Sequence, residues 1–250
     1  MRNILFIVIL FAAKVSWAIQ VPEFLTDVTA KSWLVADENN KIIGSKDTET
    51  VRSIASITKL MTAMVVLKAG LNLNQQIPYS KGVLLTRKQL LEISIVRSDN
   101  HAANLLCHSY YGGYKKCVEA MNLLAWEYGM LHTTFVDSTG LLAGNTSTAQ
   151  DLLVLLNRAE EFPLIVESSA KTKVEIKIKK KWLVFKNTNP LVGRNHEFII
   201  TKTGTTSAAG GCIVFTAKTD TGIRRVVILG SKNGRTRIPE AEFIFENVKE

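Results

Sequence analysis

The sequence predicts an α+β fold of the α/β sandwich type, in which an antiparallel sheet made from the N- and C-terminal segments is flanked by helices. Two patterns predict it: strand-like alternation of apolar residues lies at both ends of the 250-residue chain, whereas the stretch at about 71–160 has helical spacing. Such a distribution inserts an all-helical lobe into a sheet that both ends complete. The chain is 46% hydrophobic and 21% charged, so it can bury a core, and disorder is excluded.

The first elements follow from a change of period near residue 56. Strands are expected at 32–36 and 41–44, on either side of a polar turn that suits a hairpin. From Ser56 onward apolar residues recur at helical spacing, and Gly70 follows where a C-terminal cap would lie, which predicts a buried helix over 56–69. Further helical patterns complete the lobe at 86–95, 100–110, 114–128 and 148–160.

Period-two alternation returns beyond Lys171. It predicts a hairpin with strands at 174–178 and 182–185 and with the lysine run 179–181 at its tip. The remaining expected elements are strands at 198–203, 211–218 and 224–229 and a final helix over 240–248 that Pro239 opens.

The first eighteen residues have the features of an export signal. Arg2 precedes an apolar run at 4–13, and Ser16-Trp17-Ala18 provides the small residues of a cleavage site. The run is too short to span a bilayer, so cleavage is favoured over retention as an anchor. We therefore expect a periplasmic protein with a single domain over 19–250 and no integral membrane anchor. Cleavage lowers the formal net charge from +9 to +7, because Arg2 and Lys14 are removed.

The basic composition narrows the choice of partners without deciding it. A positive surface attracts nucleic acid, acidic envelope polymers or carboxylate-bearing substrates. The lysine run at 179–181 has no interleaved aromatic residues and belongs to an exported chain. We therefore expect a solvated hairpin tip and no nucleic-acid partner.

Cysteines and histidines exclude some chemistries. Cys107 and Cys117 flank a predicted turn between helices; a disulfide can form there in an oxidising compartment, and the sequence leaves both states open. Cys212 lies in an apolar strand-like run and is expected to be a buried small hydrophobe. The four histidines form no HExxH or other metal-ligand spacing, so neither a metal nor a cofactor is expected.

Three short motifs occur in one order along the chain: Ser56-Ile57-Thr58-Lys59, Ser98-Asp99-Asn100 and Lys202-Thr203-Gly204. Each is weak alone, because a second Ser-x-x-Lys occurs at 168–171 and a second Ser-x-Asn at 231–233. Context separates the copies: Ser56 opens an apolar helix, whereas the second copies lie in a polar stretch and a Gly-flanked turn. The conjunction of all three motifs therefore carries the functional argument.

The first motif pairs a serine with an amine. A serine hydroxyl is a poor nucleophile until a base removes its proton, and residues three apart share one face of a helix, so Lys59 can reach Ser56. Lysine serves as a base when burial or a second cation disfavours its ammonium form, and Lys202 is a candidate for that cation. Without these conditions the motif would be an ordinary N-cap serine followed by a solvated lysine.

The other two motifs would form the rest of a cleft. Ser98 can relay a proton between the lysines and a leaving amine, and Asn100 offers an amide to a peptide-like substrate and to Lys59. The same Ser-Asp-Asn segment also suits a helix N-terminus, and the two roles are compatible.

The Lys-Thr-Gly segment is expected on an edge strand that faces the nucleophile. Lys202 and Thr203 can hold a substrate carboxylate, and Gly204 lets the backbone approach the substrate. The N–H of Thr205 can pair with that of Ser56 as an oxyanion hole.

These residues resemble those of the low-molecular-mass penicillin-binding proteins, a family of serine D-Ala-D-Ala peptidases that includes carboxypeptidases and endopeptidases. The matching segments are 51–64, 111–114, 138–141, 187–189 and 202–206, so the resemblance covers nearly all of the chain after the export signal. It is closest to the endopeptidase branch of the penicillin-binding protein 7 type, in which the chain ends after the catalytic domain. The carboxypeptidase branch adds a C-terminal β-domain and an amphipathic anchor, for which we expect no room here.

The resemblance implies a β-lactamase/transpeptidase-like fold and a serine DD-peptidase activity for residues 19–250. Ser56 would attack the carbonyl of a D-alanine in a peptidoglycan stem peptide or cross-link, and water would hydrolyse the acyl-enzyme. The resemblance also implies that β-lactam antibiotics acylate the same serine, and that the enzyme is an endopeptidase of cell-wall remodelling.

Two alternatives stay open. The second and third motifs also fit a class A β-lactamase, but the Glu-x-x-x-Asn segment such an enzyme needs is missing, since Glu119 and Asn122 come too soon after Ser98. The other alternative is a non-catalytic sensor that binds peptidoglycan or β-lactams without turnover.

Overall fold

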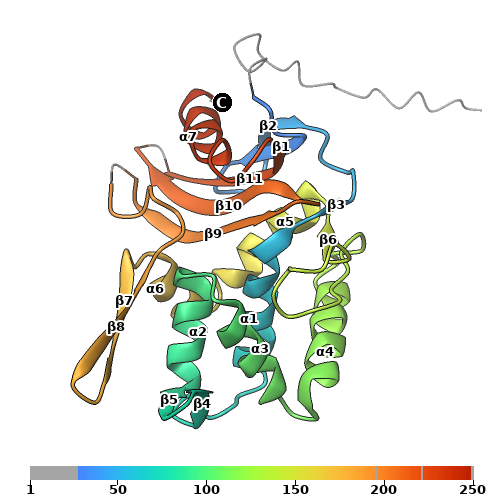
Figure 1. Ribbon diagram of the computed structural model, residues 1–250. Coiled ribbons are helices and arrows are strands. Elements are labelled where there is room, and N and C mark those ends of the chain that lie inside the picture. The colour runs from blue at the N-terminus through green and yellow to red at the C-terminus, as the bar shows by residue number, and fades with distance from the viewer. Residues whose placement is uncertain (1–27, 195, 221, 249–250) are drawn as a thin grey trace, which may run out of the picture.

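A five-stranded antiparallel sheet lies at the centre of the molecule (Figure 1). The computed structural model describes residues 28–194, 196–220 and 222–248, so the predicted export signal at 1–18 lies outside the described residues. The strands, in their order across the sheet, are β2 (Ile42–Lys46), β1 (Ser32–Ala36), β11 (Gly222–Ser231), β10 (Gly210–Thr219) and β9 (Phe198–Thr206). The sheet is therefore completed by both ends of the chain, which confirms the α+β prediction.

Both faces of this sheet are buried. Along β1, Leu34 faces one hydrophobic cluster, whereas Trp33 and Val35 face another on the opposite side. A sheet covered on both faces needs apolar residues at every position. This explains the unbroken apolar runs at 212–215 and 226–229, whose residues are almost entirely buried.

Helices cover the two faces unequally (Figure 1). One side carries the inserted lobe and the other carries a single helix, α7, which packs on β10 and β11. The helices are α1 (Thr58–Lys68), α2 (Arg87–Val96), α3 (Asn100–His108), α4 (Gly113–Glu127), α5 (Ala149–Ala159), α6 (Pro163–Ser169) and α7 (Arg237–Asn247). The layers are thus lobe, sheet and helix, as expected for an α/β sandwich.

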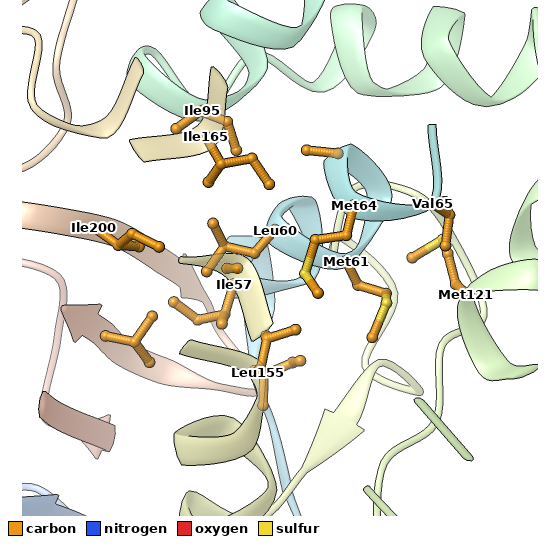
Figure 2. Close-up of a cluster of buried hydrophobic side chains, with 14 of the residues drawn as sticks. Ile57, Leu60, Met61, Met64, Val65, Ile95, Met121, Leu155, Ile165 and Ile200 are labelled. Atoms are coloured by element: carbon orange, nitrogen blue, oxygen red, sulfur yellow. The ribbon is translucent and has the colours of Figure 1, made fainter. Parts of the chain in front are cut away.

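Helix α1 forms the centre of the lobe, and its residues 58–66 are all buried. A helix that is buried all round must be packed by neighbours on every side. Figure 2 shows these neighbours around Leu60 and Met64. They include Ile200 of β9, Leu155 of α5, Met121 of α4, Ile165 of α6 and Ile95 of α2. The start of α1 is therefore fixed rigidly against the sheet edge.

Several local predictions are confirmed. Gly70 follows α1 with a φ of +65°, the left-handed conformation that a C-terminal cap requires. The hydroxyl of Thr148 accepts a hydrogen bond from the N–H of Asp151 and caps α5. Pro239 is the third residue of α7 rather than its first, a position where the missing N–H has no partner in the helix.

The lobe is not all-helical, contrary to the prediction. A hairpin of β4 (Gln76–Ser80) and β5 (Val83–Thr86) precedes α2, with Gly82 in its turn at a φ of +71°. A second short pair joins β3 (Arg52–Ser53) to β6 (Thr146–Ser147). Helix α6 was also not predicted, because its seven residues are too few to display a period.

The hairpin of β7 (Lys173–Ile178) and β8 (Lys181–Lys186) forms at the predicted place and extends away from the sheet (Figure 1). Cys107 and Cys117 form a disulfide that links α3 to α4, and Cys212 is buried as expected. Over the part of the chain that the structure describes, we find no helix with both the length and the hydropathy needed to span a membrane.

Candidate active site

The hydroxyl of Ser56 lies beside a buried amine. Ser56 belongs to a 3₁₀ turn, Ala55–Ile57, that leads directly into α1. Ala55 has a φ of +47°, an uncommon conformation for a residue with a side chain, and it places Ser56 at the entrance of α1. Nζ of Lys59 lies 2.8 Å from Oγ of Ser56. Ser56 is half-buried, so part of the residue faces solvent.

The remaining contacts of Lys59 decide how the two groups interact. Its Nζ donates to the amide oxygen of Asn100 at 2.7 Å and to the carbonyl oxygen of Thr139 at 2.7 Å. A neutral amine has two N–H groups, and these two acceptors take both. The lone pair of a neutral Lys59 is then free to accept the hydroxyl proton of Ser56.

The environment of Lys59 favours this neutral form. Its side chain is fully buried, and burial lowers the pKa of Lys59 to about 7, against the opposing effect of the Asp137 and Asp99 carboxylates. An amine that loses its proton near neutral pH can act as a general base.

Lys202 is the second buried amine of the site. Its Nζ donates to Oγ of Ser98 at 2.8 Å and to the carbonyl oxygen of Thr203 at 2.9 Å. Burial, the nearby Lys59 and then Arg237 lower the pKa of Lys202 well below its ordinary value. The charge of each amine disfavours the charge of the other, so the pair favours a neutral amine over two ammonium ions.

The segment from Ser98 to Asn100 forms the wall opposite β9. Ser98 adopts a φ of +59°, and Asp99 caps α3 by accepting from the N–H of Ala102 at 2.8 Å. Capping and site formation are therefore combined in three consecutive residues. The turn directs Ser98 to Lys202 and Asn100 to Lys59, so the two amines are linked through one short segment.

Strand β9 is an edge strand, as predicted, and it passes very close to the nucleophile. A Cβ atom on Gly204 would lie 2.7 Å from the backbone nitrogen of Ser56, so only glycine fits there. Thr203 donates its hydroxyl to Oγ1 of Thr188 at 2.7 Å, and Thr205 is exposed. The structure therefore brings the eight predicted site residues together: Ser56, Lys59, Ser98, Asn100, Lys202, Thr203, Gly204 and Thr205.

A loop around Asp137 supports the nucleophile. Residues 138–141 of this loop are among the segments that carry the family resemblance, but no role was predicted for the loop, and Asp137 was not singled out. Burial would raise the pKa of Asp137, but the N–H groups of Leu142, Thr139 and Gly140 all donate to its carboxylate, and the net pKa is lowered. The loop thereby holds the Thr139 carbonyl against Lys59. At Gly140, with a φ of +82°, a Cβ atom would collide with the carbonyl oxygen of Ala55 at 1.8 Å.

Arg237, at the start of α7, is the other residue that sequence reasoning missed. Its Nη1 donates to the carbonyl oxygen of Gly204 at 2.7 Å and to the hydroxyl of Thr205. The guanidinium is largely buried, which lowers the pKa of Arg237. It places a positive charge beside the outer end of the Lys-Thr-Gly segment. No local spacing pointed to it, because the contact depends on how α7 crosses the sheet.

The second copies of the motifs have structural roles. Ser168 bonds to the carbonyl oxygen of Leu164 within α6, and Lys171 forms ion pairs with Glu92 and Glu167 at 2.9 and 2.8 Å. Asn233 caps the turn before α7. These contacts give Lys171 and Asn233 partners in their own parts of the fold, and the choice between the copies stays a prediction.

A half-buried serine facing a buried neutral amine, on a sandwich of this topology, defines a serine hydrolase that works by acyl transfer. The chain belongs to the peptidase S11 family, D-alanyl-D-alanine carboxypeptidase, whose sequence profile matches residues 18–83 and 71–233. The resemblance to serine D-Ala-D-Ala peptidases is thus confirmed.

Individual relatives agree with the family. The chain is 42% identical over 207 residues to a D-alanyl-D-alanine endopeptidase of Escherichia coli K12, covering 75% of this chain and 67% of the relative. It is 34% identical over 234 residues to a D-alanyl-D-alanine endopeptidase of Pseudomonas aeruginosa, covering 86% and 76%. Among solved structures, penicillin-binding protein D2 of Listeria monocytogenes in its cefotaxime-bound form has a TM-score of 0.80 at 26% identity, covering 88% of this chain and 96% of that one.

Proposed function

We propose that residues 19–250 form a periplasmic D-alanyl-D-alanine endopeptidase that cleaves peptide cross-links of peptidoglycan. Ser56 is the nucleophile, Lys59 is its general base, and Ser98 relays protons. The observation that carries the proposal is the contact between Lys59 and Ser56, because an amine with a pKa of about 7 lies 2.8 Å from the hydroxyl of a half-buried serine.

The first half of the reaction forms an acyl-enzyme. Neutral Lys59 takes the proton of Ser56 as the oxygen attacks the carbonyl carbon of a D-alanine residue, and the carbonyl oxygen becomes an oxyanion. The N–H groups of Ser56 and Thr205 stabilise that charge, and the absence of a side chain at Gly204 allows the two backbones to approach. The C–N bond then breaks and Ser98 donates its proton to the departing amine; the proton that Lys59 took from Ser56 replaces it by way of Lys202, whose Nζ contacts Ser98, so Lys59 is neutral again.

The second half of the reaction hydrolyses the acyl-enzyme, with water as the nucleophile and Ser56 as the leaving group. Water attacks the ester carbonyl, neutral Lys59 accepts a proton from it, and Lys59 returns that proton to Oγ of Ser56 as the ester bond breaks, so that the hydroxyl and the neutral amine are both restored. Asn100 holds the amine of Lys59 in position through both halves.

The substrate is inferred from charge and from the relatives. Arg237, Thr205 and Thr203 lie at the end of β9 where a carboxylate-bearing peptide would be held, and the formal net charge of +7 after the expected cleavage favours a polyanionic envelope. Two relatives bear the name D-alanyl-D-alanine endopeptidase, which supports cross-links over terminal D-alanine. The cefotaxime-bound relative supports β-lactams as acylating inhibitors of Ser56.

Periplasmic location is supported by two features. Residues 1–18 have the pattern of a cleaved export signal. The disulfide between Cys107 and Cys117 suits an oxidising compartment.

The test is a digest of purified cross-linked muropeptide dimers, read by mass, with wild type, Ser56→Ala and the matched control Ser168→Ala. We expect wild type and Ser168→Ala to give monomers and Ser56→Ala to give none. Loss of a terminal D-alanine without monomers would instead indicate a carboxypeptidase.

The same samples distinguish the alternatives. A long-lived penicillin adduct on wild type without any cleavage would favour a non-catalytic sensor. Rapid nitrocefin turnover would favour a β-lactamase.

The two residues nearest to the glutamate pattern of a class A β-lactamase have other contacts. Glu119 pairs with Lys116 on the exposed face of α4, and Asn122 forms hydrogen bonds with the backbone of Phe135.

A further inference from the structure

A histidine and two glutamates converge on the face of the sheet opposite the active site. His196 comes just before β9, and Glu242 and Glu246 lie one turn apart on α7. Nε2 of His196 lies 3.5 Å from Oε1 of Glu242 and 3.7 Å from Oε1 of Glu246. The three ligand atoms all lie within 4.8 Å of one another. The sequence did not reveal this cluster, because the histidine and the carboxylates come from distant segments.

These contacts do not satisfy the histidine. Its Nε2 is buried and has no hydrogen-bond partner among the residues that the structure describes, and hydrogen bonds to carboxylates are normally about 2.7–2.9 Å long. The rings of Phe198 and Phe245 flank the imidazole with centroids 6.1 and 5.1 Å away, so the surroundings are apolar. Both carboxylates lie within ion-pair distance of the imidazole, but neither is close enough for a hydrogen bond, so the space between the three groups can take a shared partner.

The geometry points to a divalent transition-metal site, with zinc as the ion that these residues fit best. Zinc binds histidine nitrogen and carboxylate oxygen at about 2.0–2.2 Å, and in a tetrahedron such ligands lie about 3.3–3.6 Å apart. The two nitrogen–oxygen distances, 3.5 and 3.7 Å, are close to that edge, whereas the glutamate oxygens lie only within 4.8 Å and would turn toward each other on binding. Magnesium and calcium prefer ligand sets made only of oxygen, so the imidazole selects against them.

The site would fasten α7 to β9 at one end of their contact. At the other end, Arg237 of α7 already donates to the carbonyl oxygen of Gly204. A metal bound by His196, Glu242 and Glu246 would therefore fix the helix at both ends and stabilise the folded chain. Glu242 and Glu246 are partly exposed, which leaves the fourth coordination position open to water.

The experiment uses the full mature chain after chelator treatment and dialysis, titrated with zinc by calorimetry. We expect one equivalent to bind and the Tm to rise by several degrees, with no comparable rise from magnesium or calcium. Cobalt in place of zinc should give the strong visible absorption of a four-coordinate ion.

The variants are Glu242→Gln, Glu246→Gln and His196→Ala, with the exposed His132→Ala as the matched control. Each ligand variant should weaken zinc binding at least about tenfold, whereas the control should bind as wild type does. The glutamine variants keep side-chain shape, so their result stands even if His196→Ala folds poorly. Three results would overturn the proposal. Wild type would bind no zinc, magnesium would raise the Tm as much as zinc does, or the glutamine variants would still bind one equivalent of zinc with the affinity of wild type.

Discussion

The chain contains two Ser-x-x-Lys segments, at 56–59 and 168–171, and the pKa values of their lysines are shifted in opposite directions. Lys59 is fully buried and forms no ion pair within the described part of the chain, and burial lowers its pKa to about 7. At Lys171, burial alone would lower the pKa, but the carboxylates of Glu167 and Glu92 outweigh it, and the net pKa is raised. One segment therefore presents a neutral base to its serine, and the other presents a permanent cation to glutamates.

The difference shows that surroundings, not spacing, make the motif reactive. In the first segment the serine lies in the turn before α1, and the lysine points to neutral acceptors. In the second, Ser168 bonds within its own helix, α6, and Lys171 has turned to Glu167. The four predictions below test this comparison.

Replacing the two serines should give the largest contrast. Ser56→Ala removes the only atom that the acyl group can join in the proposed reaction, so kcat/KM for a D-Ala peptide should fall by about 10⁴-fold or more. Ser168→Ala should stay within about twofold of wild type. Covalent labelling with penicillin, read by intact mass, measures both. A penicillin adduct on Ser56→Ala would refute the assignment of the nucleophile.

Replacing the two lysines should give the next largest contrast. Lys59→Met keeps the volume of the stem but removes the proton acceptor, so acylation should slow by about 10²–10⁴-fold. Lys171→Met removes partly exposed ion pairs and should change stability by about 1 kcal/mol or less, without slowing acylation. Stopped-flow acylation rates and thermal melts separate the two effects. Equal rates in both variants would exclude Lys59 as the base.

The pH dependence of acylation should follow the pKa of Lys59. Below about pH 7 the amine is protonated and cannot accept the hydroxyl proton, so the rate should rise with pH, about tenfold per unit, and level off above 7. Lys171→Met should leave this profile unchanged. A rate that falls with rising pH across this range would mean that the ammonium form is the active one.

Two glycines test how tightly the nucleophile is enclosed. Gly140→Ala adds both a strained φ and a collision with the Ala55 carbonyl, so the free energy of unfolding should fall by about 2–4 kcal/mol. Gly129→Ala has a similar φ of +76° with nothing within 4 Å, and should cost only about 1 kcal/mol. Urea unfolding measures both. Equal losses would show that the loop around Gly140 can move aside.

Much of the fold was predictable because its signals are local. The strands of the sheet and α1 show clear periods, and caps such as Thr148 and Gly70 mark where helices begin or end. The β4–β5 hairpin was missed because Ile77 is the only buried residue of β4, too little to show alternation. Such a short element is stabilised by the lobe around it rather than by its own pattern.

The residues of the site also fall into two groups, those with a local sequence signal and those without one. Motif residues could be predicted because two positions three apart on a helix must face one side. Asp137 and Arg237 could not, since their roles arise from contacts that only the folded chain creates. The His196 cluster is a third example, because Glu242 and Glu246 meet the histidine only when α7 lies against the sheet.

The order of strands in the sheet controls when this enzyme can first act. β1 pairs with β11, and β9 joins the sheet only through β10, so the edge beside Ser56 is laid down by the final quarter of the chain. Ser98 and Lys202 are 104 residues apart in sequence, and their meeting closes a long loop, which is a slow event in folding. A chain still being synthesised therefore holds its serine before its second amine. Hydrolysis is thereby delayed until β9 has been made and has joined the sheet.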